Sequence, residues 1–148
     1  MVERADVGRS TLYAHFGGLE GLLSQSLTVP SMVLVALVDQ PPDLGALIGQ
    51  LEHFKEQRRR NRPFFEPPIR TRWVRRLAEL IEPRLTAARA SLRLPATLAA
   101  TQVAEAQIAL VANWLALSPT TPSSTIAEAL IAATRAMIDG LAAKTVED

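Results

Sequence analysis

Prolines and aspartates divide this chain into long stretches that are rich in leucine, alanine, glutamate and arginine. These four residue types favour helices, whereas a proline ends a helix or is confined to its first turn. Valine, isoleucine and threonine nowhere alternate with polar residues over a length that would make a strand. This spacing of helix-breaking residues limits the possible folds more than any other feature, and it predicts an all-α chain.

The positions of the helix breakers also predict where the helices begin and end. Proline, asparagine, aspartate and serine clusters mark the boundaries. The expected helices cover residues 9–16, 19–38, 43–60, 67–94, 96–117 and 123–143, with bounds that are approximate. We expect a cap at Asp43 for the third helix and at Ser123 or Ser124 for the last. We expect a kink at Pro30 in the second helix and a kink or a split at Pro83 in the fourth.

Composition excludes several classes of protein. The chain has no cysteine, so thiol catalysis, disulfide scaffolds and thiolate metal sites are excluded. It has two histidines far apart in sequence and no glycine-rich phosphate loop or nucleophile elbow, so we expect neither an enzyme, nor a metal site, nor a cofactor. Its apolar runs are too short for a membrane span, and residues 1–10 are too charged for a signal peptide, so we expect a cytoplasmic protein.

The first expected helix has a pattern that suits DNA. Leu12 and Phe16 lie one turn apart and form its buried stripe. Arg9 stands near its start. The outer face carries small and polar residues, namely Ser10, Thr11, Tyr13 and Ala14. A short helix with such a face fits a major groove as the second half of a helix-turn-helix.

Residues 3–16 (ERADVGRSTLYAHF) and 19–23 (LEGLL) resemble the tetracycline-repressor (TetR) family of bacterial transcriptional regulators. The spacing of the family pattern is kept without a gap over about twenty residues. The matching positions are Ala5, Val7, Thr11, Tyr13, Phe16, Glu20 and Leu22. The resemblance implies a homodimer, usually a repressor, that binds double-stranded operator DNA and is released by a small-molecule ligand.

The resemblance also assigns DNA contacts. Thr11 and Tyr13 match family positions that face DNA or its backbone, and the Tyr13 hydroxyl would donate to a phosphate. Arg9 would reach a base edge or a phosphate. We interpret His15 as a residue at the boundary of the core and not as a specific contact to a base. The full candidate set for DNA is Arg9, Ser10, Thr11, Tyr13, Ala14 and His15.

The chain departs from the family pattern at several positions. Asp6 replaces the usual glycine and Gly8 the usual serine, and residues 17–19 stand where the family often carries lysines that touch phosphate. Losing those charges weakens the salt-dependent part of DNA binding. The family's first helix and most of its second would precede Met1, so we expect the chain as written to bind DNA poorly, and we interpret Met1 as a mis-assigned or shortened start.

The resemblance divides the chain into a partial helix-turn-helix with its connecting helix (1–38) and a ligand-binding and dimerisation domain (39–148). The two last helices are apolar on most of their circumference, which is typical of helices buried on more than one side. A four-helix bundle between two subunits would explain this, and a monomeric core is the alternative. The expected dimer residues are Val103, Val111, Ile131 and Met137.

Aromatic and polar residues of the second part are candidates for a ligand pocket, because such pockets are apolar with a few polar groups. They are His53, Phe54, Trp73, Asn113 and Trp114. Eight arginines fall between positions 58 and 76 with one acid, Glu66, among them. We interpret them as solvated helix ends, with Arg58–Arg60 at a helix C-terminus, and an anionic ligand or a docking surface is the alternative.

These observations favour a ligand-responsive transcriptional regulator of the TetR type. The alternative is a ligand-binding or dimerisation module that does not bind DNA because its helix-turn-helix is incomplete. In the first case, ligand binding would move the helix that begins near Leu19 and change the spacing of the two DNA-binding helices in the dimer.

Overall fold

The computed structural model describes residues 18, 21, 25–89 and 91–144, and every regular element named in that part of the chain is a helix. This confirms the all-α prediction for these residues. The expected helix-turn-helix lies outside them. The elements are α3 (Thr28–Ala36), α4 (Leu44–Glu56), α5 (Arg58–Asn61), the 3-10 helix η1 (Arg62–Phe65), α6 (Ile69–Ala88), α7 (Ala96–Leu117) and α8 (Ser123–Leu141).

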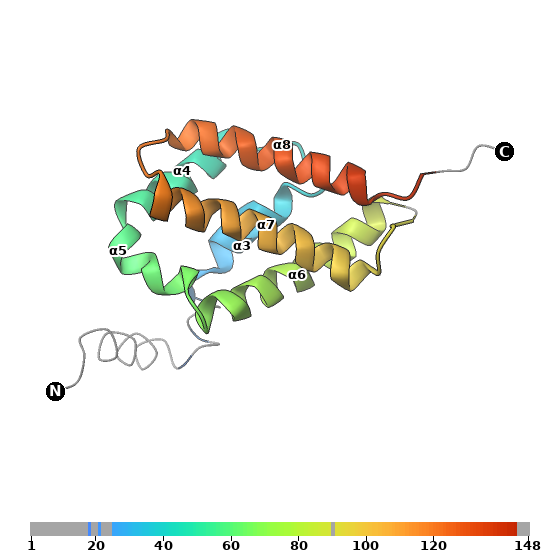
Figure 1. Cartoon of the computed structure of the whole chain (residues 1–148), viewed down its shortest axis with the longest axis horizontal. Coiled ribbons are helices and arrows are strands. Elements are labelled where there is room, and N and C mark those ends of the chain that lie inside the picture. Colours follow the sequence, from blue (N-terminus) through green and yellow to red (C-terminus); the bar gives the residue numbers. More distant parts are fainter. Residues whose placement is uncertain (1–17, 19–20, 22–24, 90, 145–148) are drawn as a thin grey trace.

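The three longest helices form one layer of the molecule, in the order α6, α7, α8 (Figure 1). Behind them, α3 packs against α6, and α4 packs against α3 and α8. The short α5 and η1 close one end between α4 and α6 (Figure 1). Residues of α3 are buried in the same core as those of α6 and α7, so the described residues before position 39 share their core with the rest of the chain.

The core between α6 and α7 follows from the spacing of apolar residues. Leu77, Ile81 and Leu85 recur every four positions and form one fully buried stripe of α6. α7, which packs against α6, carries small side chains among its buried residues, and Ala100 and Ala104 are fully buried. Small residues opposite large ones let the two helices interdigitate without voids. Within the described residues, no helix is long and apolar enough to cross a bilayer.

The helix expected from 19 toward 38 with a kink at Pro30 is interrupted earlier. The chain bends at Leu27, and α3 begins at Thr28, so Pro30 lies in its first turn. Proline has no N–H to donate to the carbonyl four residues before it, and its ring clashes with that carbonyl. In the first turn of a helix the N–H groups have no partner within the helix, so a proline there removes no hydrogen bond of the helix. The break therefore lies one turn before the proline and not at it.

Two further helix boundaries differ from the sequence-based prediction. The helix expected from Asp43 to about Arg60 ends at Glu56, and α5 starts anew after Gln57. The helix expected to reach Leu94 ends at Ala88 and includes Pro83 without being split. Pro83 is exposed, so water can replace the backbone bond that it lacks. Beyond Ala88 the chain extends, and Leu92 forms an antiparallel bridge with Ala142.

One of the two predicted helix caps is confirmed and the other is wrong. Asp43 caps α4 as expected, because its carboxylate accepts the N–H of Ala46 at 3.0 Å. The bounds of α7 are those predicted. The prediction for α8 was wrong: its N-cap is Pro122, with no side-chain cap. The hydroxyl of Ser123 donates instead to Oε1 of Glu52 at 3.2 Å and joins α8 to α4.

Candidate functional site

A first hollow lies between α4, α5 and the segment that leads into α3; we name it the His53 hollow. It has a volume of about 420 Å³. Phe54 and Phe64 are its buried aromatic residues, and His53 is exposed. Ser26, Val29 and Pro30 form the wall opposite α4. The remaining lining residues are polar, namely Gln50, Gln57, Arg60 and Asn61.

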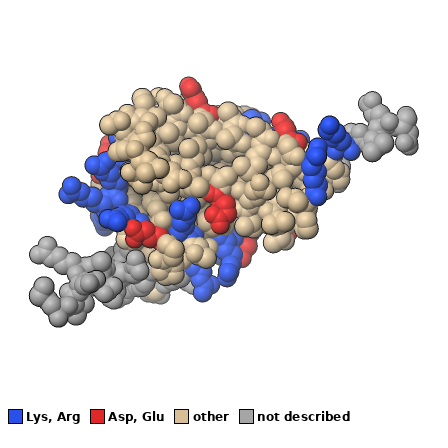
Figure 2. Space-filling view, viewed as in Figure 1, with Lys and Arg blue, Asp and Glu red and all other residues tan. Residues whose placement is uncertain are grey.

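A second hollow lies on the other side of α5; we name it the arginine hollow. It has a volume of about 490 Å³. Its charged residues come from α5, η1, the turn after η1 and the start of α6, and its apolar residues come from η1 and the end of α7. The lining residues are Arg58, Arg59, Arg62, Phe65, Glu66, Arg70, Ala112, Asn113, Leu115 and Ala116. In Figure 2, blue side chains gather at the end of the molecule where α5 lies.

Three aromatic rings separate the two hollows. The centroids of Phe54 and Phe65 are 5.4 Å apart in an edge-to-face arrangement. Trp73 lies 6.2 Å from Phe54 and 5.6 Å from Phe65. Phe54 lines the His53 hollow and Phe65 lines the arginine hollow. Such pairs stabilise beyond the area they bury, so the rings form a packed wall between the hollows.

Trp73 also connects this wall to α3. Its indole N–H donates to the hydroxyl of Ser31 at 3.0 Å, and that hydroxyl donates to the carbonyl of Leu27 at 2.6 Å. Leu27 is the residue at which the chain bends before α3. A change in the position of Trp73 would therefore reach the bend through two hydrogen bonds.

The five candidate ligand-binding residues are distributed over several places. His53 and Phe54 line the His53 hollow, and Asn113 lines the arginine hollow. Trp73 is buried in the wall between them. Trp114 is buried elsewhere, and its indole N–H donates to the carbonyl of Thr121 at 2.9 Å in the loop before α8. His53, Phe54 and Asn113 therefore line hollows, whereas Trp73 and Trp114 line neither of the two, and the assignment of a ligand to these residues stays a prediction.

The expected dimer residues also differ in accessibility. Val103 and Val111 are 0% and 2% exposed and lie in the core of the single chain, so a second copy cannot reach them in this structure. Ile131 and Met137 are half-buried and pack against the core from α8. The dimer prediction therefore stays a prediction for these two residues. The six candidate DNA residues, Arg9, Ser10, Thr11, Tyr13, Ala14 and His15, lie outside the described residues.

The interpretation of Arg58–Arg60 as the C-terminus of a long helix is wrong. α4 ends at Glu56, and the three arginines form the short α5 together with Asn61. All three are exposed, so they are solvated as expected. A single turn of four residues has little macrodipole, so helix-end electrostatics do not account for three adjacent cations.

Buried polar residues were missed by the sequence-based reasoning. Gln107 is fully buried in α7, and its Nε2 donates to the carbonyl of Leu34 at 3.1 Å and to the hydroxyl of Thr134 at 3.2 Å. It therefore joins α7 to α3 and α8. The available signal was a lone amide among apolar neighbours, since Val103, Ala104 and Val111 surround it at helical spacing.

Comparisons with known proteins add no family. No family model, no curated protein and no solved structure matches this chain. Within the described residues, no group of three or more histidine, cysteine, aspartate or glutamate side chains lies close enough to hold a metal ion. The two hollows at the end of the molecule that contains α5 form the candidate site.

Proposed function

We propose that this chain is a TetR-like, ligand-responsive transcriptional regulator that acts as a homodimer on double-stranded DNA, most simply as a repressor. The observation that carries the proposal is the order of two features along the chain. The pattern that resembles the family's DNA-binding helix spans residues 3–23. Directly after it, Ser26, Val29 and Pro30 form a wall of the His53 hollow.

This order supports a physical mechanism for the response to a ligand. A molecule in the His53 hollow would touch Phe54 on one side and Val29 and Pro30 on the other. The latter two residues lie next to the bend at Leu27, which Ser31 holds by a hydrogen bond. A ligand that fits only one position of this segment would shift the DNA-binding residues that precede it.

A homodimer through α7 and α8 is part of the same proposal. These helices lie side by side, and the face that they present in Figure 2 is largely free of charged side chains. Leu110 of α7 and Ile131 and Met137 of α8 are half-buried and pack against the core. Ile131→Glu would place an unpaired charge in the interface, so we expect monomer or aggregate by light scattering. An unchanged dimer in both Ile131→Glu and Met137→Glu would contradict this interface.

DNA binding is tested by selection of duplexes from a random pool, followed by fluorescence-anisotropy titration at low and physiological salt. We expect weak binding to an enriched, two-fold symmetric site, because residues 17–19 lack the family's lysines. Tyr13→Phe and Arg9→Ala should weaken this binding further. Arg75→Gln, an equal loss of charge on the exposed side of α6, is the control for Arg9 and should leave the enriched site unchanged.

The second candidate function is a ligand-binding or dimerisation module that does not bind DNA. The observation in its favour is the glycine pair at Gly17 and Gly18 with Leu19, where the family carries phosphate-binding lysines. Failure of the chain to enrich any duplex sequence, together with an intact dimer in solution, would favour this function over the regulator.

A further inference from the structure

The residues that line the arginine hollow carry an excess of positive charge. Four guanidinium groups line it against one carboxylate, that of Glu66. Glu66 lies 2.8 Å from Nε of Arg62 in an exposed ion pair. In the described part of the chain, no carboxylate forms an ion pair with Arg58, Arg59 or Arg70. Arginine keeps its charge at any physiological pH, so the hollow is cationic.

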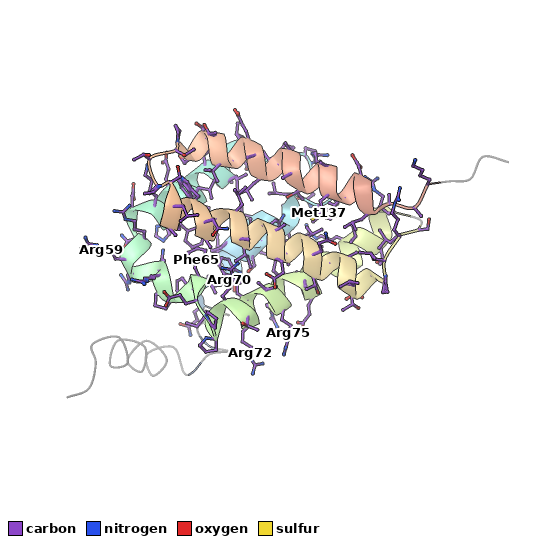
Figure 3. The ribbon with its side chains drawn as sticks, in the orientation of Figure 1. Arg59, Phe65, Arg70, Arg72, Arg75 and Met137 are labelled. Carbon is purple, nitrogen blue, oxygen red and sulfur yellow. The ribbon has the colours of Figure 1, made fainter. Side chains whose placement is uncertain are left out.

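The hollow also has an apolar surface. The ring of Phe65 is half-buried, and Ala112, Leu115 and Ala116 of α7 lie around it. Figure 3 shows Phe65 and Arg70 near one another beside α7, whereas Arg72 and Arg75 project from the other side of α6. The cations are therefore divided between a concave site with an aromatic ring and an exposed helix face without one.

This combination is unlike a surface that binds a nucleic-acid backbone. A backbone is long and needs a stripe of cations, whereas these arginines surround one hollow of about 490 Å³. Pockets for small molecules occupy roughly 300–1,000 Å³, are mainly apolar and have a few placed polar groups. The planar guanidinium group matches a carboxylate or a phosphate by paired hydrogen bonds.

We propose that the arginine hollow binds a small amphipathic organic anion, in which a carboxylate or phosphate group is attached to a flat apolar body. The anionic group pairs with Arg58, Arg59 or Arg70, and the apolar body lies against Phe65 and the end of α7. The amide of Asn113 offers one further hydrogen bond at the edge. This proposal does not rest on DNA binding or on the His53 hollow.

The experiment is isothermal titration calorimetry of the full chain with four probes: 2-naphthoate, 2-naphthyl phosphate, the neutral 2-naphthamide and acetate. We expect saturable binding of naphthoate or naphthyl phosphate. The ratio of their two dissociation constants identifies the preferred anionic group. The amide lacks the charge and acetate lacks the apolar body, so each should bind at least about tenfold more weakly. Equal binding of naphthamide, or no saturable binding of either naphthyl anion, would overturn the proposal.

Matched variants locate the site. Arg70 lines the hollow and Arg75 does not, and Arg70→Gln and Arg75→Gln each remove one positive charge from α6. We expect Arg70→Gln and Arg59→Gln to weaken binding of the preferred anion about tenfold, and Arg75→Gln to leave it unchanged. Circular dichroism checks that each variant is folded. An equal loss of anion binding in Arg75→Gln would indicate a general cationic surface and refute the hollow. The same conclusion would follow if a random-sequence DNA duplex competed with the anion and Arg75→Gln abolished this competition.

Discussion

The layer of α6, α7 and α8 and the end made by α4, α5 and η1 differ in helix length and in the residue classes that they bring together. α6 and α7 run for 20 and 22 residues without a break and meet through fully buried aliphatic side chains. α4, α5 and η1 are 13, 4 and 4 residues long, and their arginines, amides and aromatic rings surround two hollows. Uninterrupted packing provides the scaffold, and the broken helices provide room for a ligand.

The largest expected effect lies in the scaffold. Leu77→Ala removes a side chain that is 0% exposed between α6 and α7. We expect it to lower the free energy of unfolding by about 2–5 kcal/mol, measured by urea denaturation followed by circular dichroism. Phe65→Leu, at the half-buried edge of the arginine hollow, is the comparison and should cost about 1 kcal/mol. An equal loss in both variants would contradict the division into scaffold and site.

An intermediate effect tests the connection between the aromatic wall and α3. Trp73→Phe and Ser31→Ala each remove the hydrogen bond between the indole N–H and the hydroxyl. A double-mutant cycle on unfolding free energies should give a coupling of about 1 kcal/mol. Trp114→Phe with Ser31→Ala is the control pair, because Trp114 bonds to the loop at Thr121, and it should show no coupling. No coupling between Trp73 and Ser31 would mean that this hydrogen bond does not stabilise the packing of α3 against α6.

The smallest effect should have the opposite sign. Gly49 lies in the middle of α4 on its exposed side, and no atom lies within 4 Å of a Cβ added there. Gly49→Ala should therefore raise the free energy of unfolding by about 0.5–1 kcal/mol. Gly140→Ala, in the last turn of α8, is equally free of neighbours and should gain less, because helix ends fray. Destabilisation by Gly49→Ala would show that α4 is already optimised.

The fold was predictable where a boundary depends on local chemistry. α7 begins directly after Pro95 and ends at the loop 118–122, as predicted, and the Asp43 carboxylate caps α4. The break at Gln57 was not predictable, because neither proline nor glycine stands there. The end of α6 at Ala88 was missed for the same reason, because neither proline nor glycine stands between Ala88 and Leu94. Pro83 suggested a kink or a split, but α6 continues past it.

The candidate site was predictable only in part, because its residues meet through packing between distant segments. The arginine hollow brings Arg58 and Arg70 to Asn113, and no spacing rule connects these positions. Sequence grouped eight arginines as one run, whereas the fold separates Arg70 from Arg72 and Arg75 on different sides of α6. Trp73 and Trp114 looked equivalent as apolar candidates, but their indole N–H groups bond to different elements.

The bridge between Leu92 and Ala142 has a consequence for the order of folding. The N–H of Arg93 donates to Leu141 at 2.8 Å and the N–H of Ala143 donates to Ser91 at 3.1 Å, so two segments about fifty residues apart are joined with α7 and α8 between them. Closing so large a loop is entropically costly before the two helices have packed. We therefore expect these contacts to form late, and the amide protons of Arg93 and Ala143 to exchange with solvent before those in the middle of α7.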